Sequence, residues 1–186
     1  TGEPIGYELY CRSEDARYFW DRLIELGAKP TALGARDTTR MEAALPLYGH
    51  EMGECELGGE IPIYAVPLAK FAVSFAPEKG DFIGREALKK QFEALKKIMN
   101  RDYSALADLP YRIQPVYLEG RGVLRKGFPV YCKDAWAEGK QIGYVTSGTM
   151  IPYYKTKGEG LDTVFTDETG KRSIGLAYMD SRICQD

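Results

Sequence analysis

The chain has 186 residues, of which 44% are hydrophobic and 12% aromatic, and its formal net charge at pH 7 is -2. This composition is that of an ordinary globular protein with one large or two small domains. The nearly balanced charge gives no bulk attraction to nucleic acid or to an acidic membrane, and no apolar run approaches the roughly 18 residues of a membrane span. We therefore expect no nucleic acid and no membrane among its partners.

The four cysteines lie far apart in the sequence, and none of them forms a Cys-x-x-Cys pair. They are Cys11, Cys55, Cys132 and Cys184. This usage is typical of separate reduced thiols, buried or half-buried, in a cytosolic protein. With a single histidine in the chain, we expect no zinc or other metal site. The first residues carry neither a basic nor an apolar signal region, so we expect a cytoplasmic location.

The first elements are predicted to be a strand and an amphipathic helix. Residues 5–12 alternate and are rich in β-formers, which indicates a strand. Ser13 is a suitable N-cap, and Gly27 is a natural residue to follow the helix. Phe19 and Trp20 lie on the apolar face of this helix, so we expect them in the core.

Further along, a second helix is predicted over about 35–45, ending before Pro46. Residues 62–77 mix β-branched, aromatic and proline residues and are predicted to form one or two edge strands. A third helix is expected from about Arg85 to 100, with an apolar face and a solvated face of four lysines.

After about residue 108 the pattern changes to short strand-like runs separated by Gly, Asp and Lys turns. The predicted strands are 112–120, 127–133, 140–148, 162–167 and 172–179. Such spacing favours a small antiparallel barrel or sandwich. The fold class is therefore predicted as α+β, with an α+β region over 1–108 and an all-β region, a small barrel or sandwich, over 109–186.

Two stretches carry polar residues that suit a ligand. The glycine-rich run 120–129, with Arg121, Arg125 and Lys126, has the local positive charge to receive a carboxylate or a phosphate, and an exposed β-turn explains it equally well. It does not lie between a strand and a helix, so it is neither a P-loop nor a dinucleotide fingerprint. His50 has no nearby nucleophile motif, and we interpret it as structural rather than catalytic.

Glu8 lies in the stretch "GYE", next to Tyr7 and among apolar neighbours. A glutamate in such a place needs a partner if it is buried. One candidate is an arginine of the helix over 35–45, and the residues by themselves favour this structural ion pair. The other is a ligand with paired N–H donors, such as a pterin, which a carboxylate accepts in bidentate fashion.

The order of several segments resembles the glycine cleavage system T-protein, an aminomethyltransferase family. The matching stretches are "GYELY", "GAKPTALGARDTTRMEAALPLYGHEM", "GDFIGREAL", "RGVLRKGFPVY", "IGYVTSGTMIP" and "SIGLAYM". They cover nearly the whole chain, and "GARDTTRMEAALPLYGHEM" and "VTSGT" are the most specific. The resemblance implies the second half of a cloverleaf of three domains around a tetrahydrofolate cavity, so we expect a piece of a longer protein.

By the same resemblance, Glu8 and the adjacent Tyr7 bind the pterin, and Arg36 of "GARD" lines the folate site. Arg125 would help to bring the barrel against the cavity. The helix that carries Arg36 would pack behind the cavity, while Asp37, Arg40 and Glu42 would form ion pairs within the helix and between domains.

The implied reaction transfers an aminomethyl carbon from the lipoyl arm of a carrier, the H-protein, to tetrahydrofolate with release of ammonia. In the family an aspartate of the N-terminal half assists this step, so we predict no catalytic residue in this chain and no activity of the chain alone. Two alternatives are a folate-dependent demethylase of the same superfamily, and a non-catalytic folate-binding or partner-docking module.

Overall fold

The computed structural model describes residues 5–133 and 137–184. Its helices are α1 (Ala16–Glu25), α2 (Leu33–Glu42) and α3 (Arg85–Met99), with short 3-10 helices η1 (Ser13–Asp15), η2 (Ile63–Ala65), η3 (Pro67–Phe71), η4 (Pro77–Lys79), η5 (Tyr103–Asp108) and η6 (Gly160–Asp162). Its strands are β1 (Gly53–Glu54), β2 (Glu60–Ile61), β3 (Tyr111–Leu118), β4 (Pro129–Tyr131), β5 (Gln141–Lys157) and β6 (Val164–Asp180).

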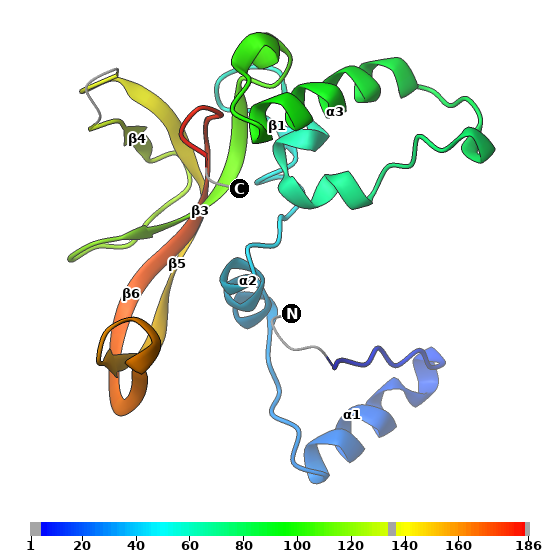
Figure 1. The fold of residues 1–186 in the computed structure, drawn as a ribbon. Coiled ribbons are helices and arrows are strands. Elements are labelled where there is room, and N and C mark those ends of the chain that lie inside the picture. Colours follow the sequence, from blue (N-terminus) through cyan, green and yellow to red (C-terminus); the bar gives the residue numbers. More distant parts are fainter. Residues whose placement is uncertain (1–4, 134–136, 185–186) are drawn as a thin grey trace.

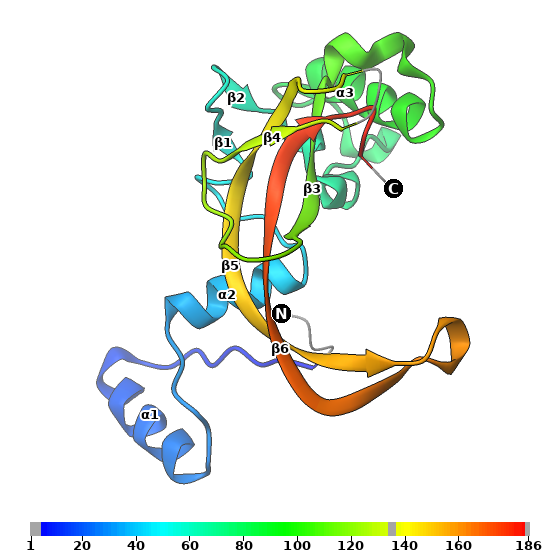
Figure 2. The ribbon, with the colours of Figure 1, turned by 90° about the vertical axis from the view of Figure 1, so that its left-hand side faces the viewer.

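The main sheet is antiparallel, with the strand order β3-β6-β5-β4. It curls strongly, and the hairpin of β5 and β6 runs beyond the other two strands as a long two-stranded ribbon that turns at η6 (Figure 2). In the described residues β3 and β4 do not pair with each other, so the sheet is open. The predicted α+β class is confirmed at this level: helices fill the first part and a curled antiparallel sheet fills the second.

The main core lies where α3 and the 3-10 turns pack on one face of the sheet (Figure 1). Its buried members come from helices, 3-10 turns and strands, and they include Tyr64, Leu95, Ile98, Leu109, Ile113 and Leu176. α3 behaves as its periodicity predicts, because Leu95 and Ile98 are buried while its four lysines are exposed. A smaller cluster around Ile142, Ala177 and Met179 covers the other face.

The N-terminal arm differs from the prediction. Residues 5–12 form no strand, and no residue of α1 is buried. Gly27 does end the helix as expected, with a φ of 95°. The prediction that Phe19 and Trp20 belong to the core is wrong, since Trp20 is 54% exposed and Phe19 is only half-buried. In Figure 1 the arm extends away from the sheet, so no other described element covers its apolar face.

Residues 62–77 form the 3-10 helices η2 and η3 instead of strands. Pro62 and Pro67 have no N–H to donate to a strand ladder, and each precedes or begins a 3-10 turn. The second helix covers Leu33–Glu42 rather than 35–45, and its chain turns at Ala44, which has a φ of 53°.

The sheet strands are longer than the sequence indicates. The predicted runs 162–167 and 172–179 are joined in the single strand β6, because Gly170 pairs with Tyr153 across the ribbon. The cysteines are all free, as expected, although Cys11 is exposed rather than buried.

One tight approach within the sheet gives a stability prediction. A Cβ on Gly148 of β5 would collide with the backbone of Leu124, whose N–H is held by the Ser173 hydroxyl at 2.8 Å. Because this hydrogen bond holds the Leu124 backbone in place, the backbone cannot easily move away from the added methyl group. Gly148→Ala should therefore lower the free energy of unfolding by about 1–3 kcal/mol. Urea unfolding measures this change.

Gly34→Ala is the matched control, because Gly34 lies in α2 and a Cβ there meets no atom. It should leave stability unchanged or raise it by up to about 1 kcal/mol. Equal effects of the two substitutions would contradict the proposed close contact.

Candidate functional site

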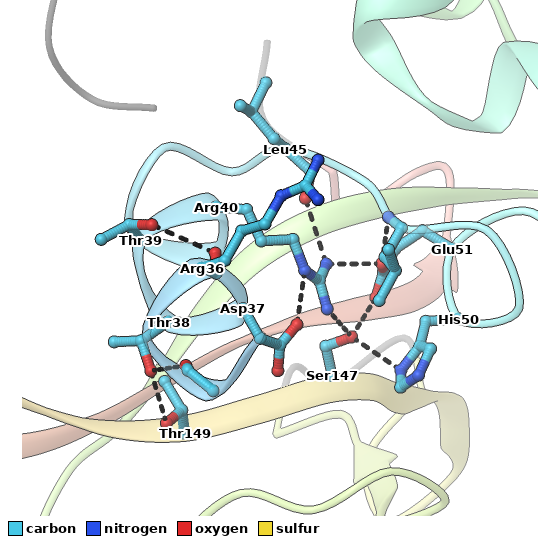
Figure 3. Close-up of polar contacts among 12 residues, drawn as sticks. Arg36, Asp37, Thr38, Thr39, Arg40, Leu45, His50, Glu51, Ser147 and Thr149 are labelled. Carbon is cyan, nitrogen blue, oxygen red and sulfur yellow. Dashed lines mark hydrogen bonds and ion pairs between the residues drawn. The ribbon is translucent and has the colours of Figure 1, made fainter. Parts of the chain in front are cut away.

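The candidate site lies where α2 and the turn after it meet the bulged part of β5. In Figure 2, α2 lies across the β5–β6 hairpin. Residues Arg36, Asp37 and Arg40 are spaced i, i+1 and i+4 on the helix, so they lie within one turn of one another. The turn 43–52 then folds back and presents Glu51 and His50 to the same place (Figure 3).

Arg40 is the centre of this site and is only 6% exposed. Its Nε donates to Asp37 Oδ1 at 2.7 Å, and its Nη1 donates to Glu51 Oε2 at 2.8 Å and to the Leu45 carbonyl at 3.1 Å. Its Nη2 donates to Ser147 Oγ at 2.8 Å. One guanidinium thus joins the helix, the turn and the sheet (Figure 3).

Glu51 is fully buried, and its carboxylate is well satisfied. Besides Arg40, it accepts from the Leu47 N–H at 2.9 Å and from the Ser147 hydroxyl at 2.6 Å. A buried charge is tolerated only when it is paired and hydrogen-bonded in this way. The pair therefore depends on α2, the turn and β5 all being in place.

An irregularity in β5 shapes the other side of the site. The register with β6 shifts between Val145 and Ser147, so Thr146 has no Cα partner on β6. Such a bulge re-aims backbone and side chains. The Thr146 carbonyl lies 3.2 Å from His50 Nδ1, and Ser147 Oγ lies at the same distance from that nitrogen. Sequence reasoning found no partner for His50, and the bulge supplies two.

A cavity of about 670 Å³ opens beside this network. Its lining includes Leu33, Arg36, Asp37, Leu45, Leu47 and His50. Arg36 is exposed, its guanidinium has no hydrogen-bond or ion-pair partner in the described part of the chain, and Figure 3 shows it extending toward Leu45. The cavity thus combines apolar walls with a cation, a carboxylate and an imidazole, which is a usual composition for a small-molecule site.

Glu8 and Tyr7 lie on the N-terminal arm, and both are exposed; Tyr7 is 95% exposed. The Tyr10 hydroxyl donates to Glu8 Oε2 at 2.7 Å, and this hydrogen bond raises the pKa of Tyr10. The expected ion pair between Glu8 and an arginine of α2 is absent from the described residues, because the arm leaves Glu8 in solvent. Its carboxylate keeps acceptor capacity for a further donor.

Arg125 is exposed, and its side chain has no polar contact with the described residues. Its neighbour Lys126 donates from Nζ to the Gly49 carbonyl at 3.0 Å. The run 120–129 therefore does approach the turn after α2, but through Lys126. The expectation of a role for Arg125 stays a prediction.

Of the three charged residues predicted to form ion pairs on α2, Asp37 and Arg40 do so, and the exposed Glu42 forms none with the described residues. Sequence reasoning missed Glu51, Thr146 and Ser147. The available signal was weak: two hydroxyl residues are adjacent in the stretch "VTSGT", and a glutamate follows the turn signal "YGH".

Over residues 5–133 and 137–184, no group of three or more His, Cys, Asp or Glu side chains has the arrangement of a metal site. Within that part of the chain, no helix is both long enough and apolar enough to cross a membrane.

Comparison with known proteins gives a consistent family. The family model described as "GCVT N-terminal domain" matches residues 1–57. An aminomethyltransferase of Bacillus mycoides (strain KBAB4) is 38% identical over 189 residues, which is 97% of this chain and 39% of that protein. An aminomethyltransferase of Caldanaerobacter subterraneus is 36% identical over 100% of this chain and 39% of its own length.

An aminomethyltransferase of Anoxybacillus flavithermus is 38% identical over 92% of the chain and 44% of its own length. These matches support the T-protein family, and the predicted resemblance is confirmed. It spans about two fifths of the length of these relatives.

The buried network predicts a large stability effect at Arg40. Arg40→Ala leaves the Glu51 carboxylate buried without its cation, and removal of one partner of such a pair costs about 3–5 kcal/mol. The double variant Arg40→Met/Glu51→Gln removes both charges and should recover part of this loss. Urea unfolding of the unaltered protein and the two variants measures the loss and its partial recovery.

Arg22→Ala is the control, because the Arg22–Glu25 pair at 2.9 Å is exposed on α1. It should change the free energy of unfolding by less than about 1 kcal/mol. A loss below about 1 kcal/mol for Arg40→Ala would show that the network does not hold the two parts together.

Proposed function

We propose that the chain is part of a tetrahydrofolate-dependent aminomethyltransferase, which transfers a one-carbon unit to tetrahydrofolate with release of ammonia. The observation that carries this proposal is the identity of 36–38% with proteins named aminomethyltransferase over at least 92% of the chain. The H-protein as carrier and the cytoplasm as location are parts of the same proposal, and they follow from the resemblance to the family.

The residues of the cavity fit a folate ligand in their chemistry. Arg36 offers a guanidinium at an open cavity, and a guanidinium binds carboxylates in bidentate fashion. Arg40 forms ion pairs with Asp37 and Glu51, and these carboxylates therefore do not pair with Arg36. This supports a role for Arg36 in holding a carboxylate of the ligand.

Glu8 and Tyr7 are proposed to contact the pterin from the N-terminal arm. The carboxylate of Glu8 is exposed and accepts one hydrogen bond, from Tyr10, which leaves lone pairs for the N–H groups of a pterin edge. Arg125 is proposed to act from the loop that Lys126 joins to the turn after α2.

The domain division is also proposed, with residues 1–108 in the folate-binding region and 109–186 in a β-barrel domain. Tetrahydrofolate supplies the nitrogens that accept the one-carbon unit. The described residues bind and orient that acceptor. Holding two bound groups in the right geometry contributes strongly to the rate of a transfer between them. We assign no catalytic residue to this chain.

The ligand roles predict a binding loss for two variants. Calorimetric titration of the whole protein with tetrahydrofolate should show binding, and Glu8→Gln or Arg36→Ala should each weaken it by about tenfold or more. This is the scale of a hydrogen bond to a charged group, about 1.5–3 kcal/mol.

Glu14→Gln and Arg17→Ala are the matched controls, because both side chains are exposed on the same arm without lining the cavity. They should leave the affinity unchanged. Absence of tetrahydrofolate binding by the unaltered protein would refute the proposed function. Folate-dependent turnover of an N-methyl donor, without turnover of the lipoyl-bound aminomethyl group, would favour the demethylase alternative.

A further inference from the structure

The contacts of His50 fix which of its ring nitrogens carries the proton. Nδ1 lies 3.2 Å from the Thr146 carbonyl, which has no proton and only accepts. A hydrogen bond to that oxygen requires a proton on Nδ1. If Nδ1 carried a lone pair instead, two acceptors would face each other at this distance.

The second neighbour of Nδ1 leads to the same assignment. Ser147 Oγ lies 2.6 Å from Glu51 Oε1, and a carboxylate that also binds Arg40 and the Leu47 N–H is an acceptor. The single hydroxyl proton of Ser147 is therefore directed to Glu51. Ser147 Oγ accepts from Arg40 and has a further lone pair for His50 Nδ1 at 3.2 Å.

This arrangement also excludes the reading of His50 and Ser147 as a base and its nucleophile. Ser147 is 3% exposed and its hydroxyl gives its proton to Glu51, so the hydroxyl is not presented to a substrate. The chain Glu51–Ser147–His50 instead orients the imidazole from behind, as a carboxylate often does for a functional histidine.

We propose that His50 is held as the Nδ1–H tautomer and presents the lone pair of Nε2 as a hydrogen-bond acceptor to the ligand of the cavity. The ring lines that cavity together with Arg36, and Nε2 has no hydrogen-bond partner in the described part of the chain. Although Nε2 has no such partner, it is not a buried atom, so solvent reaches it.

The ligand that fits such a pair of groups carries an anionic group for Arg36 and an N–H or O–H donor for His50, with an apolar part against Leu33, Leu45 and Leu47. The inference rests on the proposed function, since tetrahydrofolate has N–H groups and carboxylates of this kind. It adds to that function a neutral acceptor that selects a donor on the ligand.

The tautomer is tested without any ligand. Nitrogen-15 NMR of the protein at about pH 8.5, where a free imidazole is neutral, should give a pyrrole-like shift for Nδ1 and a pyridine-like shift for Nε2. The His50→Gln variant identifies the signals by their disappearance. A pyridine-like Nδ1 would overturn the inference.

The ligand contact is tested with His50→Asn. The asparagine amide keeps an N–H near the position of Nδ1, so the bonds to Thr146 and Ser147 are retained, while the acceptor at Nε2 is lost. We expect the thermal midpoint to be nearly unchanged and the affinity for tetrahydrofolate to fall about three- to tenfold, the scale of one neutral hydrogen bond. In the unaltered protein, the ligand should shift the Nε2 signal.

Glu42→Gln is the control, because Glu42 is exposed on α2 and does not line this cavity. Unchanged affinity in His50→Asn, with tetrahydrofolate bound by the unaltered protein, would overturn the inference and leave the proposed function standing. No binding by the unaltered protein would overturn the proposed function and the ligand contact together, and the spectrum would still decide the tautomer.

Discussion

The site depends on the buried ion pair between Arg40 and Glu51. The Arg40 guanidinium contacts α2, the turn after it and β5 together, through Asp37, Glu51 and Ser147. Such a pair contributes little net stability compared with apolar packing, because its desolvation offsets much of the attraction. Its consequence is geometric. A turn or helix displaced by one residue would leave a buried charge unpaired, so the network permits only one placement of the cavity wall.

The bulge in β5 makes this geometry possible. Thr146 and Ser147 lie at the register shift and are both buried, at 0% and 3% exposure. The Thr146 hydroxyl donates to the Leu176 carbonyl across the sheet, and the Thr146 carbonyl accepts from His50. One extra residue thus connects the hydrogen bonds of the sheet to the ring that borders the cavity.

Sequence patterns predicted the elements whose partners lie within the chain. α3 has its apolar face on the core, and the short strands of the second half are present, although β6 joins two of them. The failures have a different cause. The periodicity of α1 predicts which face is apolar, but it does not say what covers that face, and no described element does. At 62–77, proline overrides the β-propensity of its neighbours and gives 3-10 turns.

The residues of the site show the same contrast between what local sequence patterns predict and what they do not. The role of Arg36 is a prediction from resemblance, and the pairing of Asp37 with Arg40 follows from helical spacing. Ser147 lies 107 residues from Arg40, and its position depends on a register shift that no local pattern encodes. This distant contact decides what is left for a ligand. Because Arg40 pairs with Glu51 and with one oxygen of Asp37, and because Thr146 and Ser147 contact Nδ1, the polar side-chain groups that remain at the cavity among the described residues are the Arg36 guanidinium, the second oxygen of Asp37 and His50 Nε2. The buried network thereby limits the chemistry that the cavity offers to one cation, one carboxylate oxygen and one neutral acceptor on an apolar wall.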